Sequence, residues 1–93
     1  MAQVFAILRF VLSTGYIPIT VPIECSRIVI ENENASVAAQ FRTTLGDVNT
    51  EKGIGPGQEL TLQSITSAFQ AGSIVGYMAA SSGAGPAVVS YTR

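Results

Sequence analysis

The sequence predicts an all-β fold, which we expect to be an antiparallel β-sandwich or a jelly-roll-like barrel of about 6–8 short strands with at most one short helical turn. Three observations support this prediction. Short apolar runs rich in β-branched residues recur along the 93 residues, several alternate with polar residues at a period of two, and turns rich in glycine, proline, asparagine and serine separate them. Residues 1–93 are expected to form a single domain.

The clearest strand prediction covers residues 17–24, Ile-Pro-Ile-Thr-Val-Pro-Ile-Glu. Large aliphatic residues occupy every second position and share one face, namely Ile17, Ile19, Val21 and Ile23. Successive backbone N–H groups in a strand point to alternate edges, so Pro18 and Pro22 remove donors from the same edge. A strand that pairs on one side only is predicted to lie at the edge of a sheet, where proline also blocks unwanted pairing.

Further strands are predicted from short apolar or alternating runs that end at turn residues. They cover residues 26–31, 37–44, 59–63, 73–80 and 87–92. Residues 46–58 contain several glycines and are expected to be irregular. Residues 64–71 change period, because Ile65, Ala68 and Phe69 stand at positions i, i+3 and i+4, and we expect one or two helical turns there.

The opening segment permits two interpretations. Residues 4–12 fit a helical stripe, and they also fit a strand that is apolar on both faces. The segment is too short to cross a bilayer, which takes about 20 apolar residues, and it lacks the charge layout of a signal peptide. We expect residues 1–12 to form an apolar N-terminal arm that packs against a neighbouring copy or a host surface. Its candidate contact residues are Val4, Phe5, Ile7, Arg9 and Val11.

The composition predicts an oligomer or a component of a larger assembly. Hydrophobic residues make up 47% of the chain and charged residues only 12%, about half of the ~25% found in a typical globular domain. A chain of this length buries only about 60–65% of the surface that its unfolded form exposes. Burial against another subunit would shelter the remaining apolar area. A monomer with an apolar-rich core and a surface of serine, threonine and glycine is the alternative.

The chain has few residues that support catalysis at neutral pH. It contains no histidine and a single cysteine, Cys25, whereas most enzymes use a histidine, a carboxylate pair, an activated cysteine or a metal. Zinc sites need several cysteine or histidine ligands, and the six acidic residues fit no calcium-loop spacing. We therefore expect no enzyme activity, no metal and no cofactor. Cys25 is expected to be a small buried hydrophobic residue.

The sequence does not support binding of nucleotides or nucleic acids. Residues 53–57, Gly-Ile-Gly-Pro-Gly, look like a phosphate-binding loop, but a strand is predicted after them where such a loop needs a helix. A tight turn is the better interpretation. The five basic residues are scattered and the net charge is −1, whereas nucleic-acid binding needs clustered cations. We expect neither a nucleic acid nor a membrane as a partner.

The aromatic residues suggest either core packing or a contact surface. Phe41 and Phe69 lie on apolar faces and are expected in the core. Tyr16, Tyr77 and Tyr91 could form a patch, because tyrosine combines a flat apolar ring with a polar tip. Such a patch suits subunit contact or carbohydrate stacking, and subunit contact is favoured because tryptophan and clustered acids are lacking. Tyr77 and Tyr91 are therefore candidate interface residues.

From residue 25 to residue 91 the layout resembles that of small β-sandwich structural proteins of tailed bacteriophage virions. The matching stretches are Arg-Ile-Val-Ile-Glu-Asn-Glu-Asn (27–34), Pro-Gly-Gln-Glu-Leu-Thr-Leu (56–62), Gly-Ser-Ile-Val (72–75) and the turn over residues 81–86. The resemblance implies a non-enzymatic protein, made in the host cytoplasm, that decorates, cements or joins parts of the capsid or head-tail region of the virion. It also implies contact with further copies, for example as a trimer, and with a major capsid or head-tail protein. A small carbohydrate- or cell-surface-binding module is the alternative function.

Overall fold

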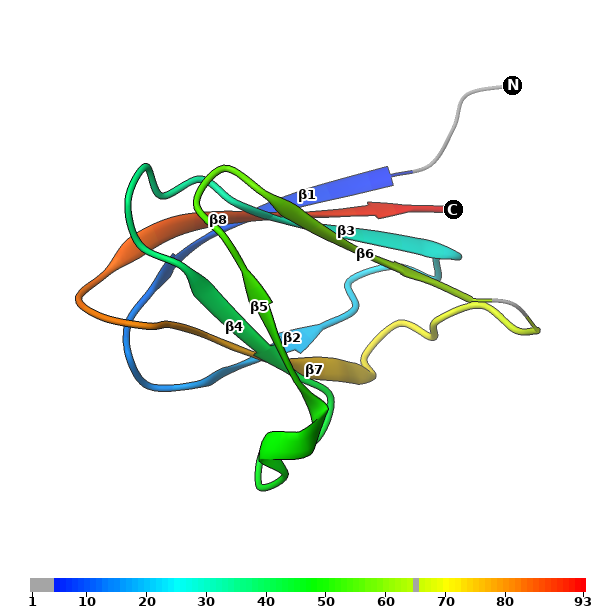
Figure 1. The fold of residues 1–93 in the computed structure, drawn as a ribbon. Helices are drawn as coiled ribbons and strands as arrows, with labels where there is room; N and C mark the ends of the chain where they lie inside the picture. The colour runs from blue at the N-terminus through cyan, green and yellow to red at the C-terminus, as the bar shows by residue number, and fades with distance from the viewer. Residues whose placement is uncertain (1–4, 65) are drawn as a thin grey trace.

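The computed structural model describes residues 5–64 and 66–93, and it confirms the all-β prediction (Figure 1). Eight strands form two antiparallel four-stranded sheets, and the helical structure in the described part of the chain is one 3-10 turn, η1 (Val48–Thr50). The strands are β1 (Phe5–Leu12), β2 (Ile17–Thr20), β3 (Arg27–Asn32), β4 (Ala39–Arg42), β5 (Glu51–Ile54), β6 (Glu59–Gln63), β7 (Ile74–Ala80) and β8 (Gly85–Thr92).

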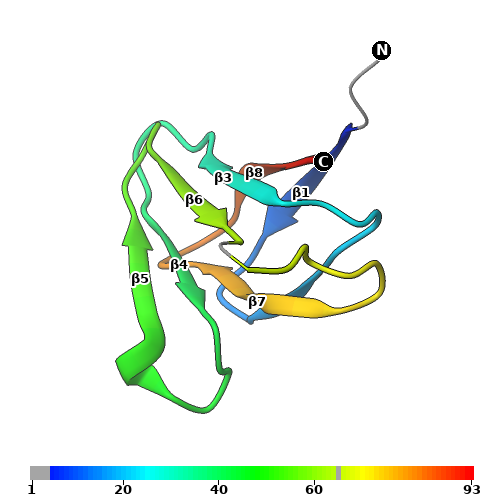
Figure 2. The ribbon, with the colours of Figure 1, turned by 90° about the vertical axis from the view of Figure 1, so that its right-hand side faces the viewer.

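The two sheets pack face to face. Sheet A has the strand order β1-β8-β3-β6, and sheet B has the order β2-β7-β4-β5; Figure 2 shows the sandwich turned by 90°. Alternate residues of each strand point between the sheets, so that Ile28 and Ile30 of β3 are fully buried while Val29 is partly exposed. Burial of a large aliphatic or aromatic side chain contributes about 1.5–3 kcal/mol to folding. The largest buried side chains come from both sheets: Leu12, Ile19, Ile28, Ile30, Phe41, Ile54, Met78, Val89 and Tyr91.

The position of β2 at an edge of sheet B confirms the prediction drawn from its prolines. The N–H of Val21 donates to the carbonyl of Ser73 at 2.9 Å, so the odd-numbered residues direct their donors toward β7. The nitrogen of Pro18 therefore faces the open edge, where no donor is needed. β2 is shorter than the predicted segment, and its register with β7 shifts between Ile19 and Thr20.

Two local expectations are wrong. Residues 46–58 are not irregular throughout, because they include η1 and β5, which pairs with β4. Residues 66–71 contain no helix, and Ile65 lies outside the described residues. Phe69 instead forms two backbone hydrogen bonds with Cys25, of 3.1 and 2.7 Å. Pairing with a distant segment overrides the weak local preference for helix.

The expected core residues are in the core. Phe41 is 1% exposed and Cys25 is fully buried as a free thiol, while Phe69 is partly buried against the same cluster. Burial raises the pKa of the Cys25 thiol, which lowers its reactivity at neutral pH.

The opening segment is a strand and not a helix. β1 pairs with β8 along all eight of its residues, while Val4 lies outside the described residues. Just after β1, the carbonyl of Ser13 accepts a hydrogen bond of 2.8 Å from the N–H of Ala80, the last residue of β7. This bond links sheet A to sheet B at the end of β1. The free edge of β1 is therefore open over residues 5–11 and closed after Leu12.

Candidate functional site

The outward face of β1 is the most exposed apolar surface that the sequence analysis singled out. Because side chains alternate along a strand, Phe5, Ile7, Arg9 and Val11 share the face that points away from the core. Phe5 is 62% exposed, Ile7 52% and Val11 80%. We call these four residues the β1 stripe. The structure thus brings together four of the predicted interface residues.

The neighbouring strands extend this face. In the register of β1 with β8, Ile7 lies opposite Ser90, Arg9 opposite Val88 and Val11 opposite Pro86. The Arg9 guanidinium forms an ion pair with Glu33 at 3.0 Å. Both side chains are well exposed, so the pair contributes at most about 1 kcal/mol. It leaves the apolar members of the β1 stripe uncovered.

The backbone of the β1 stripe is also free to pair. The carbonyl of Pro86 accepts a hydrogen bond from the N–H of Glu33, so the even-numbered residues of β8 direct their backbone groups away from β1. The odd-numbered residues of β8 then pair with the even-numbered residues of β1, which lie opposite them. The N–H and C=O groups of Phe5, Ile7 and Arg9 therefore point to the open edge of sheet A.

The four edge strands differ in how well they are protected against pairing with a strand of another molecule. Proteins protect sheet edges with prolines, charges or short strands. β2 carries Pro18, β5 has four residues with two charges among them, and β6 has five residues. β1 has eight residues, no proline and one charge. β1 is thus the least protected edge among the described strands.

The expectation that Tyr91 is an interface residue is wrong. Its side chain is 0% exposed and its hydroxyl donates to the carbonyl of Thr20 at 3.4 Å. Burial raises the pKa of Tyr91 to about 12. The position fits the alternation of β8, in which Ala87, Val89 and Tyr91 all face the core.

Tyr77 lies on β7 in sheet B, half-buried and opposite Pro18 and Arg42. Its neighbours belong to the outer face of sheet B, whereas the β1 stripe lies on the outer face of sheet A. The predicted interface residues therefore do not form one patch, and the three tyrosines do not form a surface patch because Tyr91 is buried.

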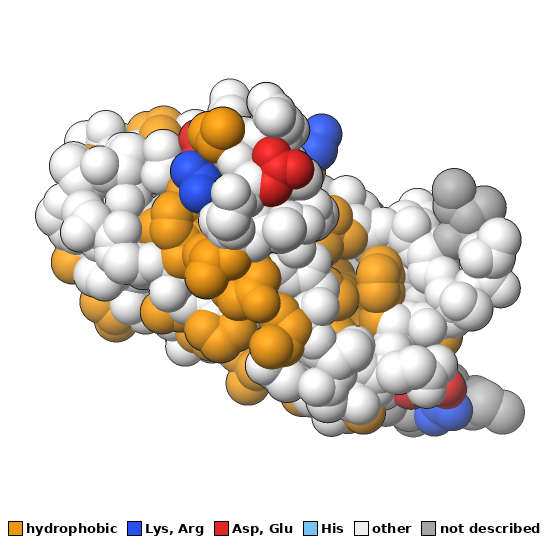
Figure 3. Space-filling view, turned by 90° about the horizontal axis from the view of Figure 1, so that it is seen from below, with side chains coloured by type: hydrophobic (Ala, Val, Ile, Leu, Met, Phe, Trp, Pro, Cys, Tyr) orange, Lys and Arg blue, Asp and Glu red, His pale blue; other side chains and the backbone are white. Residues whose placement is uncertain are grey.

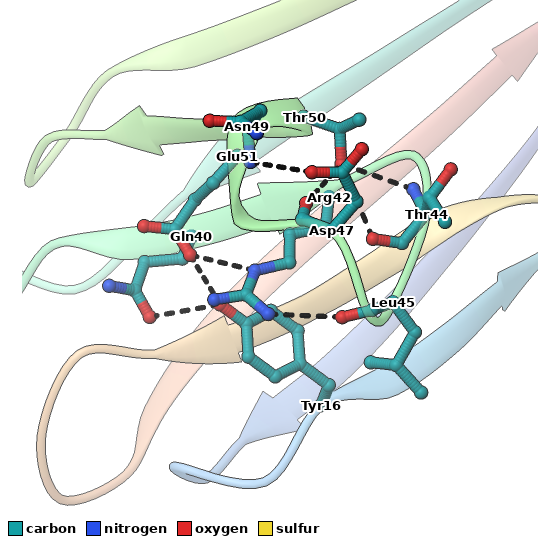
Figure 4. Close-up of polar contacts among 9 residues, drawn as sticks. All are labelled: Tyr16, Gln40, Arg42, Thr44, Leu45, Asp47, Asn49, Thr50 and Glu51. Atoms are coloured by element: carbon teal, nitrogen blue, oxygen red, sulfur yellow. Dashed lines mark hydrogen bonds and ion pairs between the residues drawn. The ribbon is translucent and has the colours of Figure 1, made fainter.

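A polar cluster that the sequence analysis missed lies on sheet B (Figure 4). The hydroxyl of Tyr16 donates to Glu51 Oε1 at 2.8 Å and lies 3.3 Å from Gln40 Oε1. The Arg42 guanidinium stacks 4.7 Å from the centre of the Tyr16 ring, and its Nε donates to Glu51 at 2.9 Å. Arg42 also donates to the carbonyl of Leu45 at 3.0 Å. We call Tyr16, Gln40, Arg42 and Glu51 the Tyr16 cluster.

The electrostatics of the Tyr16 cluster indicate a structural role. Hydrogen bonds from Tyr16 and Arg42 lower the pKa of Glu51. Burial and the hydrogen bond to Glu51 raise the pKa of Tyr16. Each charged group is neutralised by another member, so the cluster fixes the loop before β2 to the β4–β5 hairpin. Its members lie far apart in sequence, and only the pairing of Arg42 with Glu51 across the hairpin could have indicated it.

Hydrophobic side chains gather in the middle of the face that Figure 3 shows, which is the side of sheet B. Exposed hydrophobic residues of this half of the molecule include Leu45 and Val48 in the β4–β5 connection and Ile74 in β7.

A groove of about 520 Å³ opens at one end of the sandwich, beside the free edge of β6. Its walls come from β6, from the start of β7, from the segment between them and from the residue that follows β4. The apolar lining consists of Leu62, Phe69, Ile74 and Val75, and the polar lining of Thr43, Thr61, Gln63 and Ser73.

Comparison of the chain with protein-family models, with curated proteins and with solved structures found no match. Within residues 5–64 and 66–93, no group of three or more cysteine, aspartate or glutamate side chains is placed to hold a metal ion. The described part of the chain also has no helix that could span a membrane.

Proposed function

We propose that this protein is a non-enzymatic structural subunit that assembles with further copies of itself through the β1 stripe. The observation that supports this proposal is the exposure of Phe5, Ile7 and Val11 on a long, unprotected edge strand. Exposed apolar patches on an open edge are typical of association surfaces.

The energetics of the β1 stripe suit assembly. Full burial of a side chain of this size contributes about 1.5–3 kcal/mol, and these three are already partly covered, so each would contribute about 1 kcal/mol. Such a contact is weak for one pair of molecules. Repeated over many subunits, it gives a stable assembly through avidity.

We further propose that the assembly is a phage particle, in which the protein decorates, cements or joins parts of the capsid or head-tail region. The resemblance of residues 25–91 to small virion proteins supports this narrower proposal. The carbohydrate-binding alternative has no support from the geometry, because Tyr91 is buried and the Tyr16 ring is already covered by Arg42.

Sedimentation velocity of the purified protein tests the proposal. We expect the wild type to form species larger than the 9.7 kDa monomer, and their fraction to rise with concentration. Ile7→Lys with Val11→Lys should give a monomer, because it removes the apolar side chains and places lysines on the edge strand, where they oppose pairing with another chain. Val48→Lys, at a residue that is 62% exposed on the β4–β5 connection, is the matched control and should sediment like the wild type. A wild type that remains monomeric at all concentrations would overturn the proposal.

A further inference from the structure

We infer that β1 of one copy pairs with β6 of the next copy, so that sheet A continues from subunit to subunit. The inference rests on the proposed self-assembly and names the two surfaces that meet. In the register we propose, Arg9 lies opposite Glu59 of the next copy, Ile7 opposite Thr61, and Phe5 opposite Gln63.

The free edges of β1 and β6 are complementary. The N–H of Asn32 donates to the carbonyl of Gln58, and the N–H of Ser64 donates to the carbonyl of Ser26. The even-numbered positions of β6 therefore face β3, and Glu59, Thr61 and Gln63 direct their backbone groups to the open edge. Neighbouring strands of sheet A are antiparallel, so a β1 strand added beside β6 continues the alternation.

In this register the odd-numbered residues of both edges lie opposite one another. Each pair can then exchange two backbone hydrogen bonds, as in a regular antiparallel ladder. The open part of β1 includes residues 5–9, because the Ser13–Ala80 bond closes the edge only after Leu12.

Charge on the outer face of sheet A favours the same register. Glu31 of β3 lies directly opposite Glu59 of β6, and like charges in that position destabilise a sheet. No ion pair among residues 5–64 and 66–93 involves either carboxylate. Arg9 of the next copy would lie beside Glu59 and relieve the repulsion. To do so, the Arg9 side chain would turn from Glu33, which lies across β8, to the open edge, and the exposed ion pair that it gives up contributes at most about 1 kcal/mol.

The groove beside β6 supplies the apolar half of the contact. Leu62 and Phe69 line the groove next to the free edge. Leu8 of β1 belongs to the core-facing side of its strand but is 38% exposed. The proposed register places Leu8 of the next copy opposite Leu60, and Ala6 opposite Leu62. Ala6 of the next copy would thus lie beside Leu62, in the apolar part of the groove lining.

A pairing of β1 with β1 across a two-fold axis is the competing arrangement. It would leave the Glu31–Glu59 repulsion in place and the groove empty. The β1–β6 contact uses two different surfaces of each copy, so it continues beyond a dimer and yields a ring or a filament.

Cysteine cross-linking tests the register. Opposite residues of a hydrogen-bonded antiparallel pair have Cα atoms about 5.5 Å apart, within the range that a disulfide can bridge. We expect the double variant Ile7→Cys with Thr61→Cys to give a ladder of covalent oligomers on oxidation. Each single variant should give no ladder, and the buried native Cys25 should not react. Efficient dimer formation by Ile7→Cys alone, with no ladder from the double variant, would overturn the inference in favour of β1–β1 pairing.

Charge reversal provides a second test that needs no new covalent bond. Glu59→Arg should weaken self-association about five- to tenfold, because it places a cation beside Arg9. Adding Arg9→Glu to the same chain should restore most of the loss. Lys52→Glu on β5 is the control and should have no effect. If the wild type assembles but neither the ladder nor the restoration is observed, this inference fails and the proposed function stands; if the wild type does not assemble, the proposed function fails as well.

Discussion

Asn32 shows how a single polar side chain connects three segments of this fold. It is 2% exposed, and among the described residues it is the one polar residue that is buried. Its amide nitrogen lies 2.9 Å from the carbonyl oxygen of Val37, 3.0 Å from that of Ile54 and 3.3 Å from that of Gly55. Its side-chain oxygen accepts a hydrogen bond from the N–H of Asn34. The end of β3 is thereby joined to the end of β5 and to the segment before β4.

Asn32→Ala should lower the free energy of unfolding by about 2–3 kcal/mol, because it leaves buried carbonyl groups without a donor. Urea denaturation measures the change. Asn49→Ala, at an exposed position, is the control and should change stability by less than about 0.5 kcal/mol. Equal small effects of the two substitutions would show that the Asn32 bonds do not stabilise the fold.

Ionisation of Tyr91 should make the free energy of unfolding depend on pH in the alkaline range. The pKa of its hydroxyl is raised to about 12 by burial, whereas an unfolded tyrosine titrates near 10. The folded state therefore favours the neutral phenol. This contribution is complete below about pH 10 and is lost as the pH rises toward 12.

We expect the wild type to lose about 2 kcal/mol of stability between pH 10 and pH 12 through this group. Tyr91→Phe keeps the buried ring and removes the titrating group, so its stability should fall less over the same range. Chemical denaturation at a series of pH values compares the two proteins. Parallel curves would mean that Tyr91 does not control the alkaline transition.

At the scale of elements, the edge strands determine where the molecule can pair. β2 and β1 both lie at sheet edges, but β2 carries a proline at its open edge and β1 has an uninterrupted set of donors. The same fold thus combines a blocked edge with an open one. In the assembly that we propose, association is directed to β1, because β2 cannot offer a complete hydrogen-bond ladder.

Pro18→Val should create a second edge strand that can pair with another chain. It restores a backbone donor on the open side of β2 and adds a residue with high strand propensity. We expect more aggregation than in the wild type, measured by light scattering during storage at high concentration. Thr20→Val adds a similar side chain on the same strand without a new donor, and it should remain close to the wild type. Equal aggregation of the two variants would assign the effect to hydrophobicity.

The sequence allowed most strands to be predicted, because their apolar residues recur at a period of two and end at turn residues. β2 and β6 are the best examples, and the prolines even indicated an edge. β5 was missed because Glu-Lys-Gly-Ile has two charges and a glycine, and it becomes a strand through pairing with β4. The helical turn expected near Phe69 is replaced by pairing with Cys25, which local spacing does not reveal.

The candidate site was predictable in part. The candidate contact residues predicted for the opening segment include the four that share the outer face of β1, but the segment is apolar on both faces, so which face the fold covers could not be read from it. Alternation along β8 places Tyr91 beside Ala87 and Val89 in the core, so the sequence contained the signal against a surface position. The Tyr16 cluster depends on side chains from three segments, and no local pattern brings these together.

At the scale of the whole molecule, assembly and stability should be coupled. A contact that forms only between folded subunits stabilises the folded state by mass action. We expect the Tm of the wild type to rise with protein concentration. The Tm of Ile7→Lys with Val11→Lys should be independent of concentration, as measured by calorimetry. A concentration-dependent Tm in the variant would show that another surface is responsible.

The pairing of β1 with β8 has a consequence for biosynthesis. The ribosome releases β1 long before its partner, since nearly all of the described chain lies between them. Until β8 emerges, the apolar residues of β1 lack the strand with which they pair in the folded protein. Formation of sheet A must therefore wait for the last strand. Nascent chains are therefore vulnerable to premature association, and maturation of this protein should be a late event that follows translation.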